Sequence, residues 1–392
     1  MAILLKNIKG DKVIWAVVIL LSIMSFLTVY SSTGTLAYKY QGGNTQYYMF
    51  KHGLILFMGL VLMYVAHIIK YTYYSRIFQI ALYVAVPLLF ITLFFGVDLN
   101  EAKRVLPLPF GLTFQTSDLA KITLIIYLAR MLSKKQGVVH DFKSAFVPLM
   151  APVLIVTGLI FWDNLSTAAL LFTTSLVLIF IGRVKISYIL GMLGIGLIFL
   201  MIGLTILYSL PDGQQGRLGT WKSRVTGFVD GNDGNNYQAE QAKIAIATGG
   251  IVGKMPGNST QRNFLPHPYS DFIYAIIVEE YGLLGGVFVV LLYLILLFRA
   301  VKIVTKAPGS FGSFLTIGVA FSLVFQAMIN MGVAVGLLPV TGQPLPLVSM
   351  GGTSIWFTSL SIGIILSVSK EIAKKEENGI ENIDLNLESA NA

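Results

Sequence analysis

The feature that most constrains this chain is a series of ten apolar runs, most of them long enough to cross a bilayer as a helix. A spanning helix needs roughly 17 to 25 residues, because an α-helix rises about 1.5 Å per residue. Only 12% of the residues are charged, against about a quarter in soluble domains. We predict an all-α integral membrane protein with ten transmembrane helices, over residues 13–30, 54–69, 77–95, 119–133, 145–162, 165–182, 186–208, 272–298, 311–330 and 351–369.

The distribution of positive charge orients these helices. With the amino terminus inside, most of the 28 Lys and Arg residues fall in cytoplasmic segments, as the positive-inside rule requires. The sequence therefore predicts a cytoplasmic N-terminus at residues 1–12, a ten-helix membrane domain at 13–369 and a cytoplasmic tail at 370–392. Because the tail ends in the polar, acid-rich run "EENGIENIDLNLESANA", we expect it to be disordered.

Composition also excludes several kinds of site. The chain contains no cysteine, which excludes disulfides and thiolate metal sites. The net charge of +9 comes with no basic arm, so nucleic acid is not an expected partner. No His, Asp or Glu cluster has the spacing of a zinc site. The chemistry of this chain is therefore expected among the polar residues near the helix ends.

The loop between predicted helices seven and eight, residues 209–270, is much longer than ordinary connections, whose median is about 4–6 residues. Loops of this size are usually functional or disordered. Within it, Asn236 to Thr248 has apolar residues at helical spacing, which predicts a short amphipathic helix at the membrane surface. We expect this large loop to be extracytoplasmic and mostly ordered.

Three carboxylates lie at the start of the eighth predicted helix: Asp271, Glu279 and Glu280. In one interpretation Ser270 and Asp271 only cap the helix, because such side chains satisfy free N–H groups at a helix start. In the other, Asp271 is functional. On a continuous helix Glu279 lies about 12 Å deeper than Asp271, where an ionised group costs about 2.5–3.5 kcal/mol. We expect one glutamate to face a cavity or a cationic partner, or to tie helices together as a buried pair.

Further polar residues gather near the same membrane face. Asp118 and Lys121 are three residues apart, so they can pair on one helix face. Five cations could either clamp a phosphate or be ordinary solvated charges: Lys103, Arg104, Arg217, Lys222 and Arg224. After the ninth run, "GLLPVTGQPLPLVSMGG" places prolines and glycines in an apolar context, which predicts a re-entrant or tightly folded outer loop that closes one wall of a polar chamber.

These stretches resemble the SEDS family (shape, elongation, division and sporulation), the group of FtsW, RodA and SpoVE. The matching pieces are "FQTSDLAK", "AIATGGIVGK", "LPHPYSDFIYAIIVEEYGLLGG" and "QAMINMGVAVGLLPVTGQPLPLVSMGGTS", together with the ten-span layout. The resemblance covers residues 13–370, and the last motif looks closer to the FtsW division branch than to the elongation branch.

The resemblance implies a peptidoglycan glycosyltransferase in the bacterial cytoplasmic (inner) membrane, which polymerises lipid II at the outer face during septal cell-wall synthesis in cell division. It implies that Asp271 is the catalytic residue. Lipid II, a class B penicillin-binding protein, other proteins of the division or elongation complex and membrane lipids are the implied partners. Nucleic acid is not among them.

The sequence departs from the family pattern at several positions. The family often has Leu-Pro-Glu-Ala-His-Thr-Asp where this chain reads Leu-Pro-His-Pro-Tyr-Ser-Asp over residues 265–271, which removes a Glu and moves the histidine. Asn164 stands where an acid is common, Thr341 where a lysine sometimes occurs, and Val105 where a Trp often follows the Arg. We therefore assign those family side chains no essential role in this chain.

In the mechanism that the resemblance implies, Asp271 is the general base on the acceptor sugar 4-hydroxyl, since building β-linked glycan from α-linked donors requires inversion. Cationic side chains, or a divalent cation (Mg²⁺ or Mn²⁺), would stabilise the departing pyrophosphate, and no other cofactor is expected. We assign substrate binding to Lys103, Arg104, Arg217, Lys222, Arg224, Lys254, Gln238, Gln241 and Ser349. Supporting roles fall to Glu279, Glu280, Asp118 and Lys121.

Two other functions are open at this stage. A lipid II flippase or transporter would also need many helices and buried acids, although transporters commonly bind at the membrane midplane whereas the polar residues here concentrate at one face. A non-catalytic divisome scaffold would need only the helix faces that contact its partners.

Overall fold

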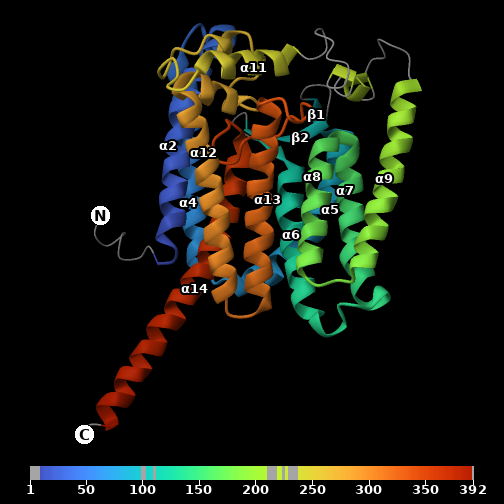
Figure 1. Cartoon of the computed structure of the whole chain (residues 1–392), viewed down its shortest axis with the longest axis vertical. Helices are drawn as coiled ribbons and strands as arrows, with labels where there is room; N and C mark the ends of the chain where they lie inside the picture. Colours follow the sequence, from blue (N-terminus) through green and yellow to red (C-terminus); the bar gives the residue numbers. More distant parts are fainter. Residues whose placement is uncertain are drawn as a thin grey trace.

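The computed structural model describes residues 9–98, 103–108, 112–209, 219–222, 226–227 and 237–390 of the chain (Figure 1). Long helices form a bundle: α2 (Lys12–Ser32), α4 (Thr45–Ile68), α5 (Tyr71–Phe95), α6 (Thr116–Lys134), α7 (Val147–Asp163), α8 (Leu165–Ile181), α9 (Ile186–Ser209), α12 (Ile273–Lys306), α13 (Ser310–Ala334) and α14 (Gly352–Ala390). Helix α11 (Tyr237–Gly249) lies across one end of the bundle, here called the α11 end, together with α3 (Gly34–Gln41) and the turn η4 (Gln261–Asn263).

These ten long helices coincide with the ten predicted runs, which confirms an all-α membrane protein. Eight helices in the described part of the chain are long and apolar enough to cross a membrane, and α8, with 17 residues, is a shorter apolar helix. Helix α6 carries Asp118, Lys121, Arg130 and Lys134 within its 19 residues. The count of ten crossings therefore stays a prediction.

Helices far apart in the sequence pack together in the centre of the bundle. Helix α14 packs along α4, and α13 packs against α6, α8, α12 and α14. Close approach of α4 and α14 depends on small residues: a Cβ on Gly363 would lie 2.5 Å from the carbonyl oxygen of Met63. Glycine at such contacts is the common means of helix association in membranes, because it lets the two backbones approach.

A small antiparallel sheet at the α11 end was not predicted. It consists of β1 (Val97–Asp98), β2 (Lys103–Leu108) and β3 (Leu112–Gln115), in the order β1-β2-β3. The sequence indicated only a rigid turn around "LPLPFG", because the two short strands carry too few residues for a clear alternation. The hydroxyl of Thr353 accepts from the backbone N–H of Gln115 (3.2 Å), so the sheet is fixed to the start of α14.

The predicted re-entrant loop is confirmed over residues 336–351. This segment contains no helix, yet its side chains Gln343, Leu345, Val348 and Ser349 are buried among the helices. Side chains of the surrounding helices bond its backbone carbonyls: Ser25 to Val348 (2.8 Å), Tyr293 to Pro346 (2.5 Å) and Gln326 to Pro344 (2.9 Å). Non-helical backbone at membrane depth is tolerated when protein partners satisfy it in this way.

Helix α12 is not continuous but reverses direction at Gly282. That residue has φ 71° and ψ −173°, which is outside the helical region. A Cβ on Gly286 would lie 3.0 Å from the hydroxyl of Tyr274, twelve residues earlier. In a straight helix twelve residues span about 18 Å, so the segment before Gly282 must fold back against the segment after it.

The loop after α11 satisfies the backbone at this reversal. The N–H groups of Leu283 and Leu284 donate to the carbonyls of Gly250 (2.9 Å) and Ile251 (3.3 Å), and the N–H of Lys254 donates to the carbonyl of Glu279 (2.9 Å). These two segments of the chain approach so closely that a Cβ on Gly282 would lie 2.1 Å from the carbonyl oxygen of Ile251. Only glycine fits this position, by conformation and by space.

Helix α11 is present where the sequence predicts a helix, but it buries a different face. Ala239, Ala242, Ala245 and Gly249 are buried, whereas the larger Tyr237 and Ile244 are exposed. Helix α11 packs on α12, and small residues allow that close contact. It is therefore a docked helix with a small-residue interface rather than a surface helix with a large apolar face.

The structure differs from the predicted disordered tail, because α14 continues as a helix to Ala390. Its side chains pair with residues at the end of the bundle opposite α11: Glu371 with Lys70 (4.0 Å), Glu376 with Lys306 (3.0 Å) and Glu377 with Lys9 (2.8 Å). Glu, Lys, Leu and Ile in this segment also have fair to good helix propensity, so a helix can extend without burying a core.

We predict that Gly282→Ala lowers stability by about 3 kcal/mol or more, because it adds a backbone clash to a positive φ. The matched control is Gly158→Ala on α7, where a Cβ meets nothing within 4 Å, so the substitution should be neutral or slightly stabilising. Thermal unfolding of the two variants in detergent is the measurement. Equal midpoints would contradict the reversal at Gly282.

Candidate active site

Asp271 lies two residues before α12 but does not cap it. The helix begins at Ile273 with Phe272 as its N-cap, and no side chain caps it. Asp271 is partly exposed, and its Oδ1 accepts a hydrogen bond from the hydroxyl of Ser270 (2.9 Å). A Cβ on Gly342 would lie 3.4 Å from Oδ2, so this oxygen faces the re-entrant loop. The interpretation of Asp271 as a helix cap is therefore wrong.

Side chains of Asn330 and Ser349 bond the backbone around Asp271 and thereby join it to the re-entrant loop. The side-chain N–H₂ of Asn330 donates to the carbonyls of Asp271 (2.8 Å) and Gln343 (2.7 Å). The hydroxyl of Ser349 donates to the carbonyl of Ser270 (2.7 Å) and accepts from the N–H of Leu345 (2.7 Å). The position of Asp271 is thus set by α13 and the loop rather than by the helix that follows it.

The reversal at Gly282 changes the depth of the three carboxylates. Glu280 receives a short hydrogen bond from the hydroxyl of Ser31, in the last turn of α2. The carbonyl of Ser270, beside Asp271, accepts from the hydroxyl of Ser349. The carbonyl of the preceding loop residue, Val348, accepts from the hydroxyl of Ser25 on α2. Six residues separate Ser25 from Ser31, which is about 9 Å along a helix. Asp271 is therefore deeper than Glu280, which reverses the order expected for a continuous helix.

Tyr269 lies on the same short segment as Asp271. Its carbonyl accepts from the N–H of Met350 (2.8 Å), and its hydroxyl lies 3.5 Å from Nδ1 of His267. Burial raises the pKa of the Tyr269 phenol above its ordinary value, and the neighbouring Tyr48, Tyr40 and Asp271 raise it further. This phenol is therefore neutral at physiological pH and can donate a hydrogen bond beside Asp271.

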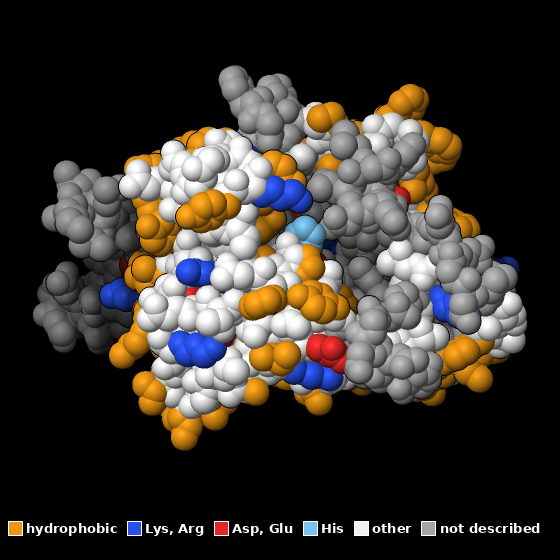
Figure 2. Space-filling model, turned by 90° about the horizontal axis from the view of Figure 1, so that it is seen from above, with side chains coloured by type: hydrophobic (Ala, Val, Ile, Leu, Met, Phe, Trp, Pro, Cys, Tyr) orange, Lys and Arg blue, Asp and Glu red, His pale blue; other side chains and the backbone are white. Residues whose placement is uncertain are grey.

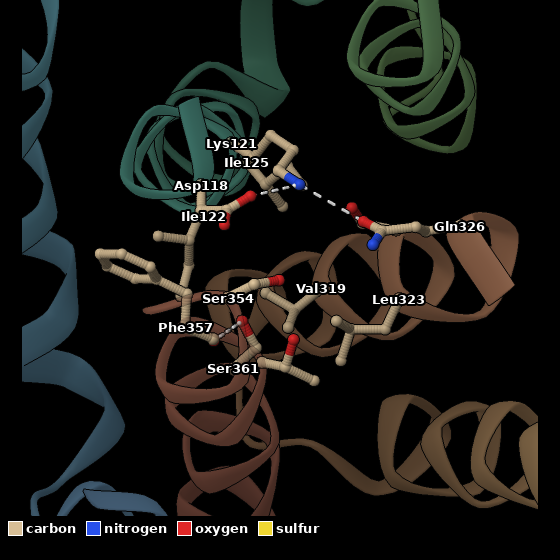
Figure 3. A pocket seen from close by; sticks show the side chains of 12 residues that line it. Asp118, Lys121, Ile122, Ile125, Val319, Leu323, Gln326, Ser354, Phe357 and Ser361 are labelled. Atoms are coloured by element: carbon tan, nitrogen blue, oxygen red, sulfur yellow. Dashed lines mark hydrogen bonds and ion pairs between the residues drawn. The ribbon is translucent and has the colours of Figure 1, made fainter. Parts of the chain in front are cut away.

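A polar cavity between α6, α13 and α14 contains the predicted Asp118–Lys121 pair (Figure 3). Lys121 Nζ lies 2.7 Å from Asp118 Oδ1, which confirms the pair, and 3.3 Å from Oε1 of Gln326. The other carboxylate oxygen, Oδ2, is buried and has no hydrogen-bond partner. Hydroxyls of Ser322, Ser354, Thr358 and Ser361 also line the cavity, whose volume of about 40 Å³ is large enough to admit water.

Gln326 connects this cavity to the re-entrant loop. Its Oε1 accepts from Lys121 while its amide N–H₂ donates to the carbonyl of Pro344 (2.9 Å). Gly342, two residues before Pro344, faces Asp271. The amide of Gln343 donates to the hydroxyl of Thr167 on α8 (2.7 Å). Polar side chains of α13 and α8 therefore hold the loop segment that lies against Asp271.

Asn164 explains how this chain does without the acid common in the family. Its side-chain oxygen accepts from the N–H of Thr167 (3.1 Å) and caps α8. Asparagine and aspartate are about equally good N-caps. An N-cap at this position thus positions Thr167, which in turn accepts from Gln343.

Glu279 is the centre of a second polar cluster. Its carboxylate accepts from Lys254 Nζ (2.7 Å), the hydroxyl of Ser259 (2.5 Å), the hydroxyl of Thr260 (2.8 Å) and the N–H of Gln261 (3.2 Å). The expected cationic partner of one glutamate is therefore Lys254. The sequence grouped Lys254 with substrate-binding cations, but here it neutralises a fully buried carboxylate and helps to fix the loop beside Gly282.

The remaining predicted residues lie on other segments of the chain or outside the described residues. Gln238 and Gln241 are partly buried on α11, and Lys222 is partly buried in the loop. Lys103 and Arg104 lie on β2, where only their backbone is described. Arg217 and Arg224 fall outside the described residues. None of the ion pairs in the described part of the chain involves Asp271.

Seen from the α11 end, this face carries separate Lys and Arg side chains, and hydrophobic side chains edge it (Figure 2). Within the described residues, no group of three or more His, Cys, Asp or Glu side chains could hold a metal ion. The described residues therefore do not form a carboxylate-rich cation site of their own.

The sequence analysis missed several residues that hold this site together. Gln326 and Asn330 lie four apart on the apolar helix α13, and they are buried. Polar residues at that spacing in a membrane helix share one face, which was the available signal. Gln343 and Arg262 carried no such signal, because their partners Thr167 and Ser31 are distant in the sequence.

Comparisons with known proteins identify the family of this chain. The family model of the cell cycle proteins FtsW, RodA and SpoVE matches residues 11–374. The chain belongs to this family. A probable peptidoglycan glycosyltransferase FtsW of Geobacter metallireducens is 32% identical over 374 residues, which is 93% of this chain and 96% of the relative. The stage V sporulation protein E of Bacillus subtilis is 29% identical and covers 93% of this chain and 98% of its own length.

Solved structures share the fold of this family member. The structure of a peptidoglycan synthase complex that coordinates polymerization and crosslinking has a chain with a TM-score of 0.74, at 23% identity, covering 93% of this chain and 98% of that chain. The rod shape determining protein RodA of Thermus thermophilus has a TM-score of 0.66 at 23% identity, covering 92% and 97%. At these identities the likeness concerns the fold alone.

We predict that Glu279→Gln destabilises the protein by about 2 to 3 kcal/mol, because it removes the charge that Lys254 and several donors compensate. The matched control is Glu376→Gln, whose exposed pair with Lys306 should contribute less than about 1 kcal/mol. Thermal unfolding in detergent distinguishes them. A midpoint for Glu279→Gln as high as that of the control would show that the buried cluster contributes little.

The raised pKa of Tyr269 leads to a pH prediction. A raised pKa in the folded state means that the stability contributed by neutral Tyr269 is constant below its unfolded pKa of about 10 and is lost only as the pH rises further. Tyr269→Phe should therefore leave the shape of the pH–stability curve unchanged between pH 5 and 9, a range chosen well below that pKa. A new transition within that range would contradict this reading.

Proposed function

We propose that this chain is a peptidoglycan glycosyltransferase that polymerises lipid II into glycan strands at the α11 end of the bundle. The family and the names of its relatives support this class of reaction. The observation that carries the proposal is the position of Asp271. Its carboxylate is partly exposed, faces the re-entrant loop through Gly342 and is held through its own backbone by Asn330.

In this mechanism Asp271 accepts the proton of the acceptor 4-hydroxyl as that oxygen forms a bond to the anomeric carbon of the donor. The bond from the anomeric carbon to the lipid pyrophosphate breaks, and the pyrophosphate leaves with the electron pair, so the configuration inverts. A base must be held in a fixed position for such a displacement. The bonds from Asn330 and Ser349 to the carbonyls of Asp271 and Ser270 meet this need.

The charge that stabilises the leaving pyrophosphate has several candidate sources in this proposal. Lys103, Arg104, Arg217, Lys222 and Arg224 keep the role that the sequence analysis assigned to them, as does a divalent cation held mainly by the substrate. Lys254 is no longer one of them, because its ammonium neutralises Glu279. Gln238 and Gln241 remain proposed substrate contacts. Ser349 is not one of them, because it is buried and its hydroxyl bonds the backbone of Ser270 and Leu345.

The proposal places the α11 end outside the cytoplasm, with both termini in the cytoplasm of the bacterial cell. It also assigns the chain to septal synthesis with a class B penicillin-binding protein that crosslinks the product. One solved relative is described within a complex that combines polymerization and crosslinking, which supports a crosslinking partner. A lipid II flippase is less well supported, since Asp271, Glu279 and Glu280 all lie toward one end of the bundle.

We predict that Asp271→Asn abolishes lipid II polymerisation by the purified full chain with its transpeptidase partner, with a rate loss of at least about 100-fold for removal of a general base. The matched control is Asp141→Asn, an exposed helix-capping aspartate at the opposite end, which should retain activity because asparagine caps equally well. Gel separation of labelled glycan chains is the readout.

The same preparation distinguishes the alternatives. A flippase, reconstituted in liposomes, would move labelled lipid II from one leaflet to the other without forming glycan. A scaffold would support normal cell-wall synthesis in cells that carry Asp271→Asn. Polymerisation by folded Asp271→Asn protein at the wild-type rate would overturn the assignment of Asp271 as the base.

A further inference from the structure

An open crevice lies at the α11 end between α3 and η4, and Asp271 is not among its lining residues. Its volume is about 630 Å³, and it is lined by Gly34, Thr35, Tyr38, Lys39, Arg262 and Asn263. Two of these six residues are cations, and none is a carboxylate. The described lining therefore has a net positive charge and several hydrogen-bond donors, which suits an anionic ligand.

The guanidinium of Arg262 is held in place from behind the crevice. Its Nη1 donates to the carbonyl (2.9 Å) and the hydroxyl (3.2 Å) of Ser31. Ser31 in turn donates to the fully buried carboxylate of Glu280, so this acid lies behind the arginine and not among the lining residues. An arginine fixed in this way loses less entropy when its remaining N–H groups bind an anion.

Neutral donors surround the two cations. The side chains of Thr35, Tyr38 and Asn263 each carry an O–H or N–H donor in the lining. A Cβ on Gly34 would meet nothing within 4 Å, so the chain beside the crevice is open to a ligand. The crevice can thus surround a tetrahedral anion with donors from both α3 and η4.

Exposed aromatic residues place the crevice at the boundary of the bilayer. Tyr38 is 80% exposed, Tyr40 62% and Phe50 70%, on α3 and the adjoining start of α4. Aromatic side chains gather at the level of the lipid headgroups, and exposed apolar side chains such as Leu27 and Leu54 continue along α2 and α4 below them. An anion at this level is most simply the headgroup of a lipid whose chains lie on α2 and α4.

We propose that the crevice binds the phosphate group of a membrane lipid, with Arg262 as the bidentate partner and Lys39 as a second charge. A phosphate of this kind has two sources, an ordinary anionic phospholipid or a polyprenyl phosphate of the class that the proposed function uses. The shared phosphate chemistry does not depend on polymerisation. Only the polyprenyl source rests on the proposed function.

The test measures lipid binding to the purified full chain in detergent by native mass spectrometry. The probes are phosphatidylglycerol, a diacylglycerol without phosphate, undecaprenyl phosphate and inorganic phosphate. We expect retention of phosphatidylglycerol or undecaprenyl phosphate over diacylglycerol. Lys39→Gln should weaken this binding about fivefold, as expected for loss of one cation near a membrane surface. Arg262→Gln should weaken it more.

The matched control is Lys243→Gln, which removes an exposed cation on α11 outside the crevice and should leave binding unchanged. Melting curves check that each variant is folded, and Lys39→Gln is the safer variant because the Lys39 ammonium lies over the exposed ring of Tyr40 rather than in a buried cluster. Preferential binding of undecaprenyl phosphate supports the polyprenyl source, and comparable binding of phosphatidylglycerol supports a general lipid phosphate site.

Three results would overturn the proposal. They are equal retention of diacylglycerol, unchanged binding by folded Lys39→Gln and Arg262→Gln variants, or equally tight binding of inorganic phosphate alone. Because the readout is binding, its failure would leave the polymerisation proposal standing, and an inactive Asp271→Asn variant that still binds the lipid would separate the two.

Discussion

The backbone reversal at Gly282 is the constraint on which the α11 end depends. Two segments of the chain, residues 249–254 and 278–284, exchange backbone hydrogen bonds. They approach so closely that a Cβ on Gly249, Gly253 or Gly282 would clash with the other segment. The carboxylate of Glu279 then gathers the next loop residues through Ser259, Thr260 and Gln261. Because the reversal turns residues 273–281 back along the bundle, it carries Asp271 inward. Without it, the same sequence would place Asp271 at the surface and the glutamates in the hydrocarbon region.

The re-entrant loop shows how a membrane protein can hold irregular backbone at depth. Its carbonyls need donors, since no lipid can supply them. Ser25, Tyr293, Gln326 and Asn330 supply those donors from three different helices. The same bonds hold the loop against which Asp271 lies, so the hydrogen bonds that satisfy the loop backbone also position the site. The hydrogen bonds of Gln326 and Asn330 to backbone carbonyls therefore offset the cost of burying these polar side chains in the apolar helix α13.

The polar residues considered for function lie toward the α11 end of the bundle and are divided among separate clusters. Asp271 and its loop, the Asp118–Lys121 cavity, the Glu279–Lys254 cluster and the crevice at Arg262 each have their own charge balance. Such an arrangement suits a substrate that has a lipid tail in the membrane and a sugar head in water. The apolar faces of α2 and α4 can accept the tail, while the polar groups act on the part that leaves the bilayer.

The amino-acid sequence by itself determined the membrane class, the approximate positions of the long helices, the irregular loop after α13 and Asp271 as the residue of interest, because apolar length and clusters of proline and glycine are local signals. It also indicated the Asp118–Lys121 pair, since both residues lie on one helical face. Tertiary structure alone decided the depth of Asp271 relative to Glu280, the pairing of Glu279 with Lys254, the bond from Gln343 to Thr167 and the crevice at Arg262. Each of these depends on segments that are distant in sequence and meet only in the folded bundle.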